Sequence, residues 1–331
     1  MPANLTPQYK EAEERYRQAG TPEEKLAALE DMLAIIPKHK GTEHLQADIK
    51  TRIAKLRKLD EKKGQGKHGP EYNVEKEGGG QVVLVGPPNS GQSTLLSRLT
   101  NARPEIGDYP FTTQKPLPGM MEYEDIKFQI VDMPPVTEEF TEPWMVAVGK
   151  NADACALVVD MNAGSVLEDI ETTLGVLEKH RLRLWGWERT APPVEGTVLM
   201  QTRKAVMLAN KMDLSDAADN LQVISEMYGD RFPILEVSGA TGAGLEEVRQ
   251  TVFRMLDVVR VYTKIPGKPA DMKSPYVIPR GTTVIELATM VHKDLAQKLR
   301  FARIWGTHMF DGQMASRDHV LEDKDVIELH A

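Results

Sequence analysis

The chain has little cysteine and no long apolar run. Its one cysteine is Cys155, so no disulfide can form inside the chain. No stretch of about 18 or more apolar residues occurs, and the N-terminus carries charges where a secretory leader would have an apolar core. We therefore expect no membrane partner and a cytoplasmic protein.

The net charge of −8 is unevenly distributed. Between residues 38 and 68, ten lysines and arginines stand against four acidic residues, so this segment is basic while the rest of the chain is acidic. A basic segment of this kind is typical of a surface that releases counterions from nucleic-acid phosphates. It is also typical of a solvated helix face, and charge alone does not separate the two interpretations.

Residues 1–70 have the pattern of a helical domain. Thr6-Pro7 and Thr21-Pro22 each place a capping hydroxyl before a proline at the first helical position. A third helix is expected after Gly41-Thr42, where apolar residues recur every three or four positions. Mostly off that apolar stripe lie the basic residues Lys50, Arg52, Lys55, Arg57 and Lys58. The polar, glycine-rich residues 71–80 are predicted to be a linker.

Residues 81–260 alternate between short apolar strands and amphipathic helices. The expected strands are 81–85, 127–131, 154–159, 205–209 and 233–237, and the expected helices lie near 92–102, 165–180, 216–228 and 244–258. This alternation predicts an α/β fold with a mostly parallel sheet that is covered on both faces. Residues 182–204 resist the pattern and are assigned to a short insertion. From 261 to 331, the pattern predicts a small mixed sheet crossed by one helix.

The stretch GPPNSGQST follows the first expected strand and matches a phosphate-binding loop with one change. In the pattern G-x-x-x-x-G-K-[ST], the glycines and the serine are present, but Gln92 replaces the lysine. Such glycines let backbone N–H groups point at phosphates, and the serine hydroxyl can ligate magnesium. The candidate phosphate-site residues are Gly86, Pro87, Pro88, Asn89, Ser90, Gly91, Gln92, Ser93 and Thr94.

Further short motifs follow in order, most of them at the ends of expected strands. DYPFTT offers Thr113 as a second magnesium hydroxyl, and VDMPPV ends a strand with Asp132, a carboxylate placed to hold magnesium through water. The motif NKMD supplies a carboxylate that can accept from the N1–H and exocyclic amine of guanine. The small residues of VSGA let the backbone approach the carbonyl oxygen of the base. The candidate base-site residues are Asn210, Lys211, Asp213, Ser238, Gly239 and Ala240.

These motifs together resemble the Obg-like GTPases, and most of all the branch of developmentally regulated GTP-binding proteins. The start MPANL, the basic helical segment and the ending RVYTKIPGKPADMKSPYVIPRGTTV are also similar to that branch. From about Val261 the chain resembles a TGS domain, a β-grasp module. The resemblance implies a helical domain at 1–70, a P-loop GTPase domain at 81–260 and a TGS-like domain at 261–331.

The resemblance also implies ligands. GTP or GDP would bind through the two candidate sets above, with Mg²⁺ held by Ser93, Thr113 and, through water, Asp132. Asn89 occupies the position that helps to coordinate K⁺ in potassium-dependent relatives, although a turn role explains it equally well. The basic helices and the TGS-like domain imply contact with the ribosome or RNA.

The chain departs from the family pattern at positions that would contact the γ-phosphate of GTP. Gln92 brings no charge where an ammonium would contact the β- and γ-phosphates. Pro135 replaces the glycine of D-x-x-G and has no N–H to sense the γ-phosphate. Val136 follows it, and an apolar residue at that position is usual in Obg-like proteins. The 182–204 segment is also too short for the extra domain that close relatives insert.

Two hypotheses for function remain open. The first is a slow GTP-hydrolysing switch that acts on ribosomes or RNA. The alternative is a pseudo-GTPase, a scaffold that binds the nucleotide weakly or not at all. Asp213 disfavours a third, an ATP-using enzyme, because adenine presents no donors to this carboxylate. The sequence identifies no catalytic residue.

Overall fold

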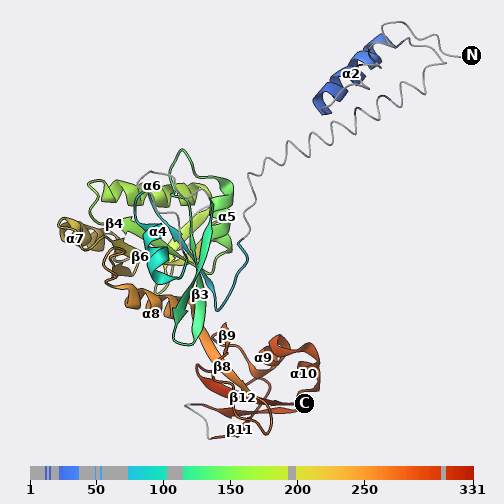
Figure 1. Cartoon of the computed structure of the whole chain (residues 1–331), viewed down its shortest axis with the longest axis vertical. Helices are drawn as coiled ribbons and strands as arrows, with labels where there is room; N and C mark the ends of the chain where they lie inside the picture. The colour runs from blue at the N-terminus through green and yellow to red at the C-terminus, as the bar shows by residue number, and fades with distance from the viewer. Residues whose placement is uncertain are drawn as a thin grey trace, which may run out of the picture. The chain divides into compact units, whose positions relative to one another are not determined.

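The computed structural model describes residues 74–102, 115–192, 199–306 and 311–331, together with 22–36 and the single positions Ala12, Arg15, Ile49 and Ile53 (Figure 1). The chain divides into two compact units, Met1–Pro70 and Glu71–Ala331, and each is described by itself. Thr113 lies outside the described residues. So do the five basic residues proposed for RNA contact, which are Lys50, Arg52, Lys55, Arg57 and Lys58.

The N-terminal unit contains helix α2 (Pro22–Ile35), which begins at the proline that the Thr21-Pro22 pair predicted. Leu29, Met32 and Ile36 form a small core with Ala12, Ile49 and Ile53. Ile49 and Ile53 are helical and buried, as expected for members of the apolar stripe of the third helix. The hydrophobic period of that segment therefore identified its buried side.

In the part of the chain that the structure describes, the first sheet of the second unit has seven strands. They are β1 (Gln81–Val85), β2 (Leu117–Tyr123), β3 (Ile126–Asp132), β4 (Ala154–Asp160), β5 (Leu182–Gly186), β6 (Gln201–Asn210) and β7 (Ile234–Glu236). Their order is β2-β3-β1-β4-β6-β5, and β7 also pairs with β6. Every pairing is parallel except that of β2 with β3, so the mostly parallel sheet is confirmed.

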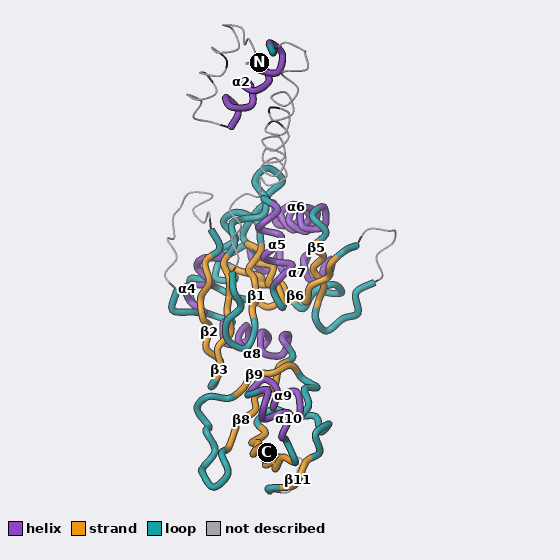
Figure 2. Tube along the Cα trace, turned by 90° about the vertical axis from the view of Figure 1, so that its right-hand side faces the viewer, coloured by secondary structure: helices purple, strands orange, loops and turns teal. Residues whose placement is uncertain are grey.

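Helices cover both faces of this sheet (Figure 2). They are α4 (Gln92–Leu99), α5 (Pro143–Asn151), α6 (Val166–Lys179), α7 (Ala217–Tyr228) and α8 (Leu245–Leu256). One core joins the sheet to α5, α6 and α7, and a second joins its other face to α4 and α8. All five residues of β1 are buried because both faces of a central parallel strand are covered.

Strand β2 was not predicted, because its sequence LPGMMEY contains Pro118 and Gly119. Both residue types weaken a strand, but an edge strand tolerates them, since one side of its backbone needs no ladder partner. In the strand order of the described residues β2 stands at the edge of the sheet, where it pairs with the strand β3 and has one isolated bridge from Met121 to Thr100. The edge position therefore explains why local propensity was misleading here.

Two assignments from the sequence need correction. The two ends of the segment 182–204 belong to the main sheet and are not part of an insertion. They form β5 and the start of β6, which pair in parallel within that sheet. Leu182 and Leu184 are fully buried in its core. Within the expected 71–80 linker, Gly79 donates to the carbonyl of Lys127 at 2.8 Å and Val74 packs against a core, so residues 74–80 are docked.

The second sheet has five strands among the residues described, in the order β11-β10-β12-β8-β9. The elements are β8 (Val258–Lys264), β9 (Tyr276–Pro279), α9 (Val284–Val291), α10 (Lys293–Lys298), β10 (Phe301–Trp305), β11 (Gln313–Ala315) and β12 (Asp325–His330). β12 is parallel to β8, whereas the other pairings are antiparallel. Val284, Leu287 and Ala288 of α9 pack into the sheet's core, as a β-grasp module requires.

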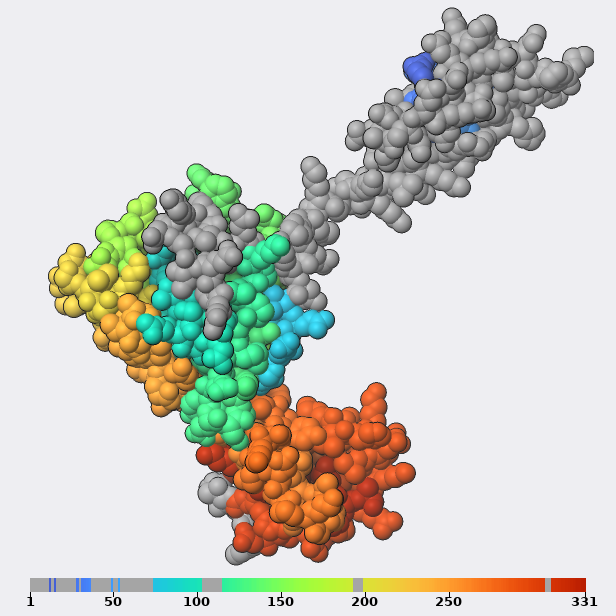
Figure 3. Space-filling model, in the orientation of Figure 1, coloured from blue at the N-terminus to red at the C-terminus, as the bar shows by residue number. Residues whose placement is uncertain are grey.

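Arg260 on β8 connects the two sheets. Its side chain is 3% exposed, and it donates to both carboxylate oxygens of Asp323 at 3.0 and 2.7 Å. It also donates to Asp125 at 3.0 Å and to Glu124, the two residues of the turn between β2 and β3. Burial acts to raise the pKa of Asp323 and Asp125, but these bonds, with one from Tyr262 to Asp125, hold both pKa values below the usual range. Figure 3 shows the green β2–β3 region against the orange and red C-terminal residues.

We expect Arg260→Met to lower the free energy of unfolding by about 3 kcal/mol, because it leaves partly buried carboxylates without their guanidinium. Arg280→Met is the matched control. Its ion pair with Asp257 is more than half exposed, at 57% and 53%, so its removal is expected to cost less than about 1 kcal/mol. Chemical denaturation of both variants at pH 7 measures the difference. Equal losses in the two variants would contradict the proposed importance of Arg260.

Candidate nucleotide-binding site

The candidate residues gather at one edge of the main sheet. The glycine loop follows β1, Asp132 ends β3, Asn210 ends β6, and the SGA loop follows β7 shortly after its last residue. The carboxyl ends of parallel strands meet at the same edge, which is where ligands bind in open α/β sheets. The sheet thus brings together motifs that are far apart in the sequence.

The backbone of the phosphate loop depends on two of its residues. A Cβ at Gly86 would collide with the carbonyl oxygen of Val158, so only glycine fits there. Gly91 adopts a left-handed conformation, with φ of 93°, and precedes the first residue of α4. No side chain caps this end of α4. The helix therefore presents its N-terminus and its first backbone N–H groups to the loop, as an anion site requires.

Gln92 lies inside this loop. It is 7% exposed, and its Nε2 donates to the Ser90 hydroxyl at 3.2 Å. Its Oε1 is buried and accepts no hydrogen bond from any residue that the structure describes. The side chain therefore fills the loop without supplying the positive charge that a lysine would bring to bound phosphates.

Ser93 and Asp132 place two oxygen atoms side by side. The hydroxyl of Ser93, on the first turn of α4, donates to Oδ2 of Asp132 at 2.5 Å. Asp132 is 1% exposed at the end of β3. A hydroxyl and a carboxylate are hard oxygen donors of the kind that magnesium prefers.

The backbone that follows Asp132 is tied to the phosphate loop. The N–H of Val136 donates to the carbonyl of Gly86 at 2.9 Å. Val136 is 3% exposed and belongs to the core under α5 and α6. Pro135, immediately before it, has no N–H to donate. This segment is therefore held by contacts within the protein and offers neither N–H group to a phosphate.

Asn210 joins the phosphate loop to the SGA loop. Its Nδ2 donates to the carbonyl of Ser90 at 2.8 Å, and its Oδ1 accepts from the N–H of Gly239 at 3.0 Å. The side chain is 2% exposed. Both of its polar atoms are thus occupied within the protein. Nδ2 carries a second hydrogen, so Asn210 positions the two loops and its expected contact with the base stays a prediction.

The SGA loop leaves one backbone donor available. The N–H groups of Ser238, Gly239, Thr241 and Gly242 have acceptors within the protein. Within this described loop, the N–H of Ala240 has none, and Ala240 is exposed. Nearby, Oδ1 of Asp213 accepts from the Ser238 hydroxyl at 2.5 Å. A carboxylate and an outward N–H of this kind complement a ring that offers both donors and a carbonyl acceptor.

Two residues near the site were not singled out in the sequence. Asp160 ends β4 and accepts from Lys211 at 2.6 Å, which holds the lysine of NKMD beside the site. Its position at the end of an apolar strand, like that of Asp132, was the available signal. Arg98 donates to the carbonyls of Gly239 and Ala240, and its sequence gave no signal, because the contact spans more than 140 residues of chain.

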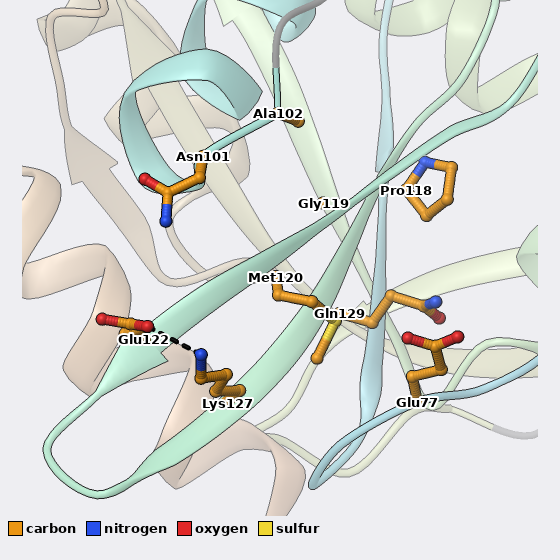
Figure 4. A pocket seen from close by; sticks show the side chains of 9 residues that line it. All are labelled: Glu77, Asn101, Ala102, Pro118, Gly119, Met120, Glu122, Lys127 and Gln129. Atoms are coloured by element: carbon orange, nitrogen blue, oxygen red, sulfur yellow. Dashed lines mark ion pairs between the residues drawn. The ribbon is translucent and has the colours of Figure 1, made fainter.

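A cavity of about 310 Å³ lies elsewhere on the sheet, along β2 and β3 (Figure 4). Its walls include Asn101, Met120 and Gln129, and the ion pair between Glu122 and Lys127, with 2.8 Å between charged atoms, lies at its lining. None of the candidate nucleotide-site residues lines it. We therefore do not assign the nucleotide to this cavity.

Comparison with known proteins agrees with this arrangement. A family model described as "50S ribosome-binding GTPase" matches residues 81–185, and a TGS domain model matches residues 259–331. An uncharacterized GTP-binding protein of Methanocaldococcus jannaschii is 27% identical over 365 residues, covering 93% of this chain and 92% of its own. Developmentally-regulated GTP-binding protein 1 of Xenopus laevis is 27% identical over 360 residues, covering 92% and 98%. The chain thus contains a GTPase domain and a TGS domain, and over most of its length it is similar to developmentally regulated GTP-binding proteins.

A solved structure, that of a GTP binding protein from Pyrococcus horikoshii, is 16% identical with a TM-score of 0.49, covering 76% of this chain and 99% of its own. The alignment with the M. jannaschii relative spans 365 positions, whereas this chain has 331 residues, so the alignment contains gaps in this chain. The M. jannaschii relative therefore carries residues that have no counterpart in this chain.

Proposed function

We propose that this chain is a cytoplasmic protein that binds GTP and GDP, hydrolyses GTP slowly and contacts the ribosome or RNA. The observation that carries nucleotide binding is the bridge through Asn210, which holds the phosphate loop and the SGA loop together at the carboxyl edge of the sheet. A nucleotide that spans both loops would meet the N-terminus of α4 with its phosphates and Asp213 with its base.

The base site supports guanine over adenine. The carboxylate of Asp213 can accept from N1–H and the exocyclic amine of guanine, and the outward N–H of Ala240 can donate to the carbonyl oxygen of that base. Adenine presents an unprotonated nitrogen and an amine in the corresponding places, so both contacts would become unfavourable. Both groups are exposed here and would be covered by a bound base, and a ligand that leaves covered polar groups unpaired is rejected.

Magnesium fits the pair formed by Ser93 and Asp132, whose oxygens lie 2.5 Å apart. Ser93 would ligate the ion directly, Asp132 would hold it through water, and Thr113 remains the proposed third residue. Among the described residues no group of three or more His, Cys, Asp or Glu side chains could hold a metal. The remaining ligands would be phosphate oxygens and water, as is usual for Mg²⁺, which would neutralise charge on the β- and γ-phosphates.

Asn89 remains a proposed potassium ligand. It is exposed in the phosphate loop, and its φ of 59° is left-handed. Asparagine tolerates that conformation better than most residues, so a role in the turn is supported equally by the same observation.

The bond from Val136 to Gly86 favours a second candidate function, a scaffold that binds guanine nucleotide without hydrolysing it. In a GTPase switch, the N–H after the D-x-x motif senses the γ-phosphate. Here that position is Pro135, and the next N–H is already bonded to the phosphate loop. Gln92 removes a further charged contact with the same phosphate.

We expect Gln92→Lys to raise the rate of phosphate release from GTP at least tenfold. The restored ammonium would stabilise charge on the transferred phosphoryl group, a contribution of about 2–4 kcal/mol. Gln92→Met, similar in length and without charge, is the control and should give no gain. Phosphate release is measured in magnesium with potassium or sodium. An unchanged rate for Gln92→Lys contradicts our account of Gln92, whereas no release above blank from the unmodified protein leaves only the scaffold function.

We expect the triple reversal of Lys50, Lys55 and Lys58 to Glu to weaken binding to ribosomes or RNA and to reduce its salt dependence, because fewer counterions are released. The same charge change at Lys115, Lys127 and Lys179, three exposed positions on the GTPase domain, is the control. Co-sedimentation or filter binding at several salt concentrations measures both. If the first set of substitutions leaves the affinity unchanged, the proposed RNA contact is wrong and the basic residues form a solvated helix face.

A further inference from the structure

Arg98 links the helix behind the phosphate loop to the loop that faces the base. It lies in the last turn of α4 and is exposed. Its Nε donates to the carbonyl of Gly239 at 3.1 Å, and its Nη2 donates to the carbonyl of Ala240 at 2.7 Å. One guanidinium thus holds two successive carbonyls of the SGA loop, a geometry that suits its rigid fork of donors.

The first of these bonds determines where a neighbouring N–H points. The carbonyl of Gly239 and the N–H of Ala240 belong to the same peptide unit. None of the described peptide bonds is cis, and in a planar trans peptide the C=O and N–H point in opposite directions. Arg98 therefore turns the Ala240 N–H away from α4 by holding the oxygen on the α4 side.

Two other observations show that the loop is also restrained at Gly239, next to this peptide. The N–H of Gly239 is bonded to Asn210, and a Cβ at Gly239 would lie 3.1 Å from a methyl carbon of Thr94 on α4. The loop is therefore packed against α4 and has little freedom on that side. The peptide between Gly239 and Ala240 could still rotate about the backbone bonds that flank it. Among the described contacts, the two hydrogen bonds from Arg98 oppose this rotation.

We propose that Arg98 is a positioning residue for guanine recognition, because it aims the Ala240 N–H at the carbonyl oxygen of the base. This inference rests on the proposed function and assigns a specificity role within that site. It differs from a general structural role, since it concerns one hydrogen bond to one atom of the ligand.

Three ligands isolate that hydrogen bond. GDP and inosine diphosphate both carry the 6-carbonyl, and inosine lacks only the exocyclic amine that faces Asp213. The 6-thio analogue of GDP keeps the N1–H and the amine but replaces the oxygen by sulfur, a weaker acceptor. A change in the Ala240 N–H should therefore affect the first two ligands alike and the third much less.

We expect Arg98→Ala to raise the Kd for GDP and for inosine diphosphate about tenfold, the loss expected for one hydrogen bond, with the Kd for 6-thio-GDP changed far less. Arg98→Lys should recover only part of the affinity, since an ammonium lacks the planar fork. Arg254→Ala, another exposed arginine in the last turn of a helix, is the control and should leave all three Kd values unchanged. Competition against a fluorescent GDP analogue measures them.

The outcomes separate this inference from the proposed function. If the unmodified protein fails to bind GDP, or binds ADP equally well, the proposed function fails and the inference with it. If the unmodified protein prefers GDP, but Arg98→Ala weakens all three ligands equally or weakens none, the proposed function stands and the role of Arg98 is overturned.

Discussion

The buried amide of Asn210 is the constraint on which the nucleotide site depends. It stands at the end of β6, a strand paired with β4, β5 and β7, so the sheet holds its backbone firmly. Its side chain connects Ser90 with Gly239 and fixes the distance between the phosphate loop and the base loop. Without it, two buried backbone groups would lose their partner, at about 1–3 kcal/mol each.

The two halves of the site differ in what they retain. The half that would bind the base has the carboxylate of Asp213 and the outward N–H of Ala240, and Arg98 holds its loop by a hydrogen bond. The γ-phosphate half has an uncharged Gln92, a proline without an N–H, and a Val136 N–H already bonded to Gly86. Only contacts that strengthen in the transition state accelerate a reaction, and these are the contacts that the chain lacks. We therefore propose that this protein retains nucleotide binding and that its hydrolysis is slow or lost.

Local sequence patterns predicted most of the framework because its central strands are buried apolar runs and short polar motifs follow their carboxyl ends. The five expected strands formed at or within a few residues of their positions, and the motif residues lie at their carboxyl ends. The missed strands have physical reasons. β2 carries Pro118 and Gly119, which only its edge position permits, and β5 lies beside tryptophan and proline residues that resemble a loop.

The roles of single polar side chains were harder to predict. Asn210 was expected to hold the guanine, and only the fold shows that its amide also joins the phosphate loop to the SGA loop. Arg98 and Arg260 act through partners more than 60 residues away, and no short pattern encodes such contacts. The magnesium role of Thr113 and the RNA role of the basic helix remain predictions.

The most direct test of this account compares the affinity of the unmodified protein for GDP and for a non-hydrolysable GTP analogue, in magnesium. The account predicts that both bind and that their Kd values agree within about threefold, because Gln92 is uncharged, Pro135 has no N–H and the Val136 N–H is already bonded to Gly86. A GTP analogue that binds more than about tenfold tighter than GDP would contradict it, since one charged contact to the γ-phosphate would then have survived.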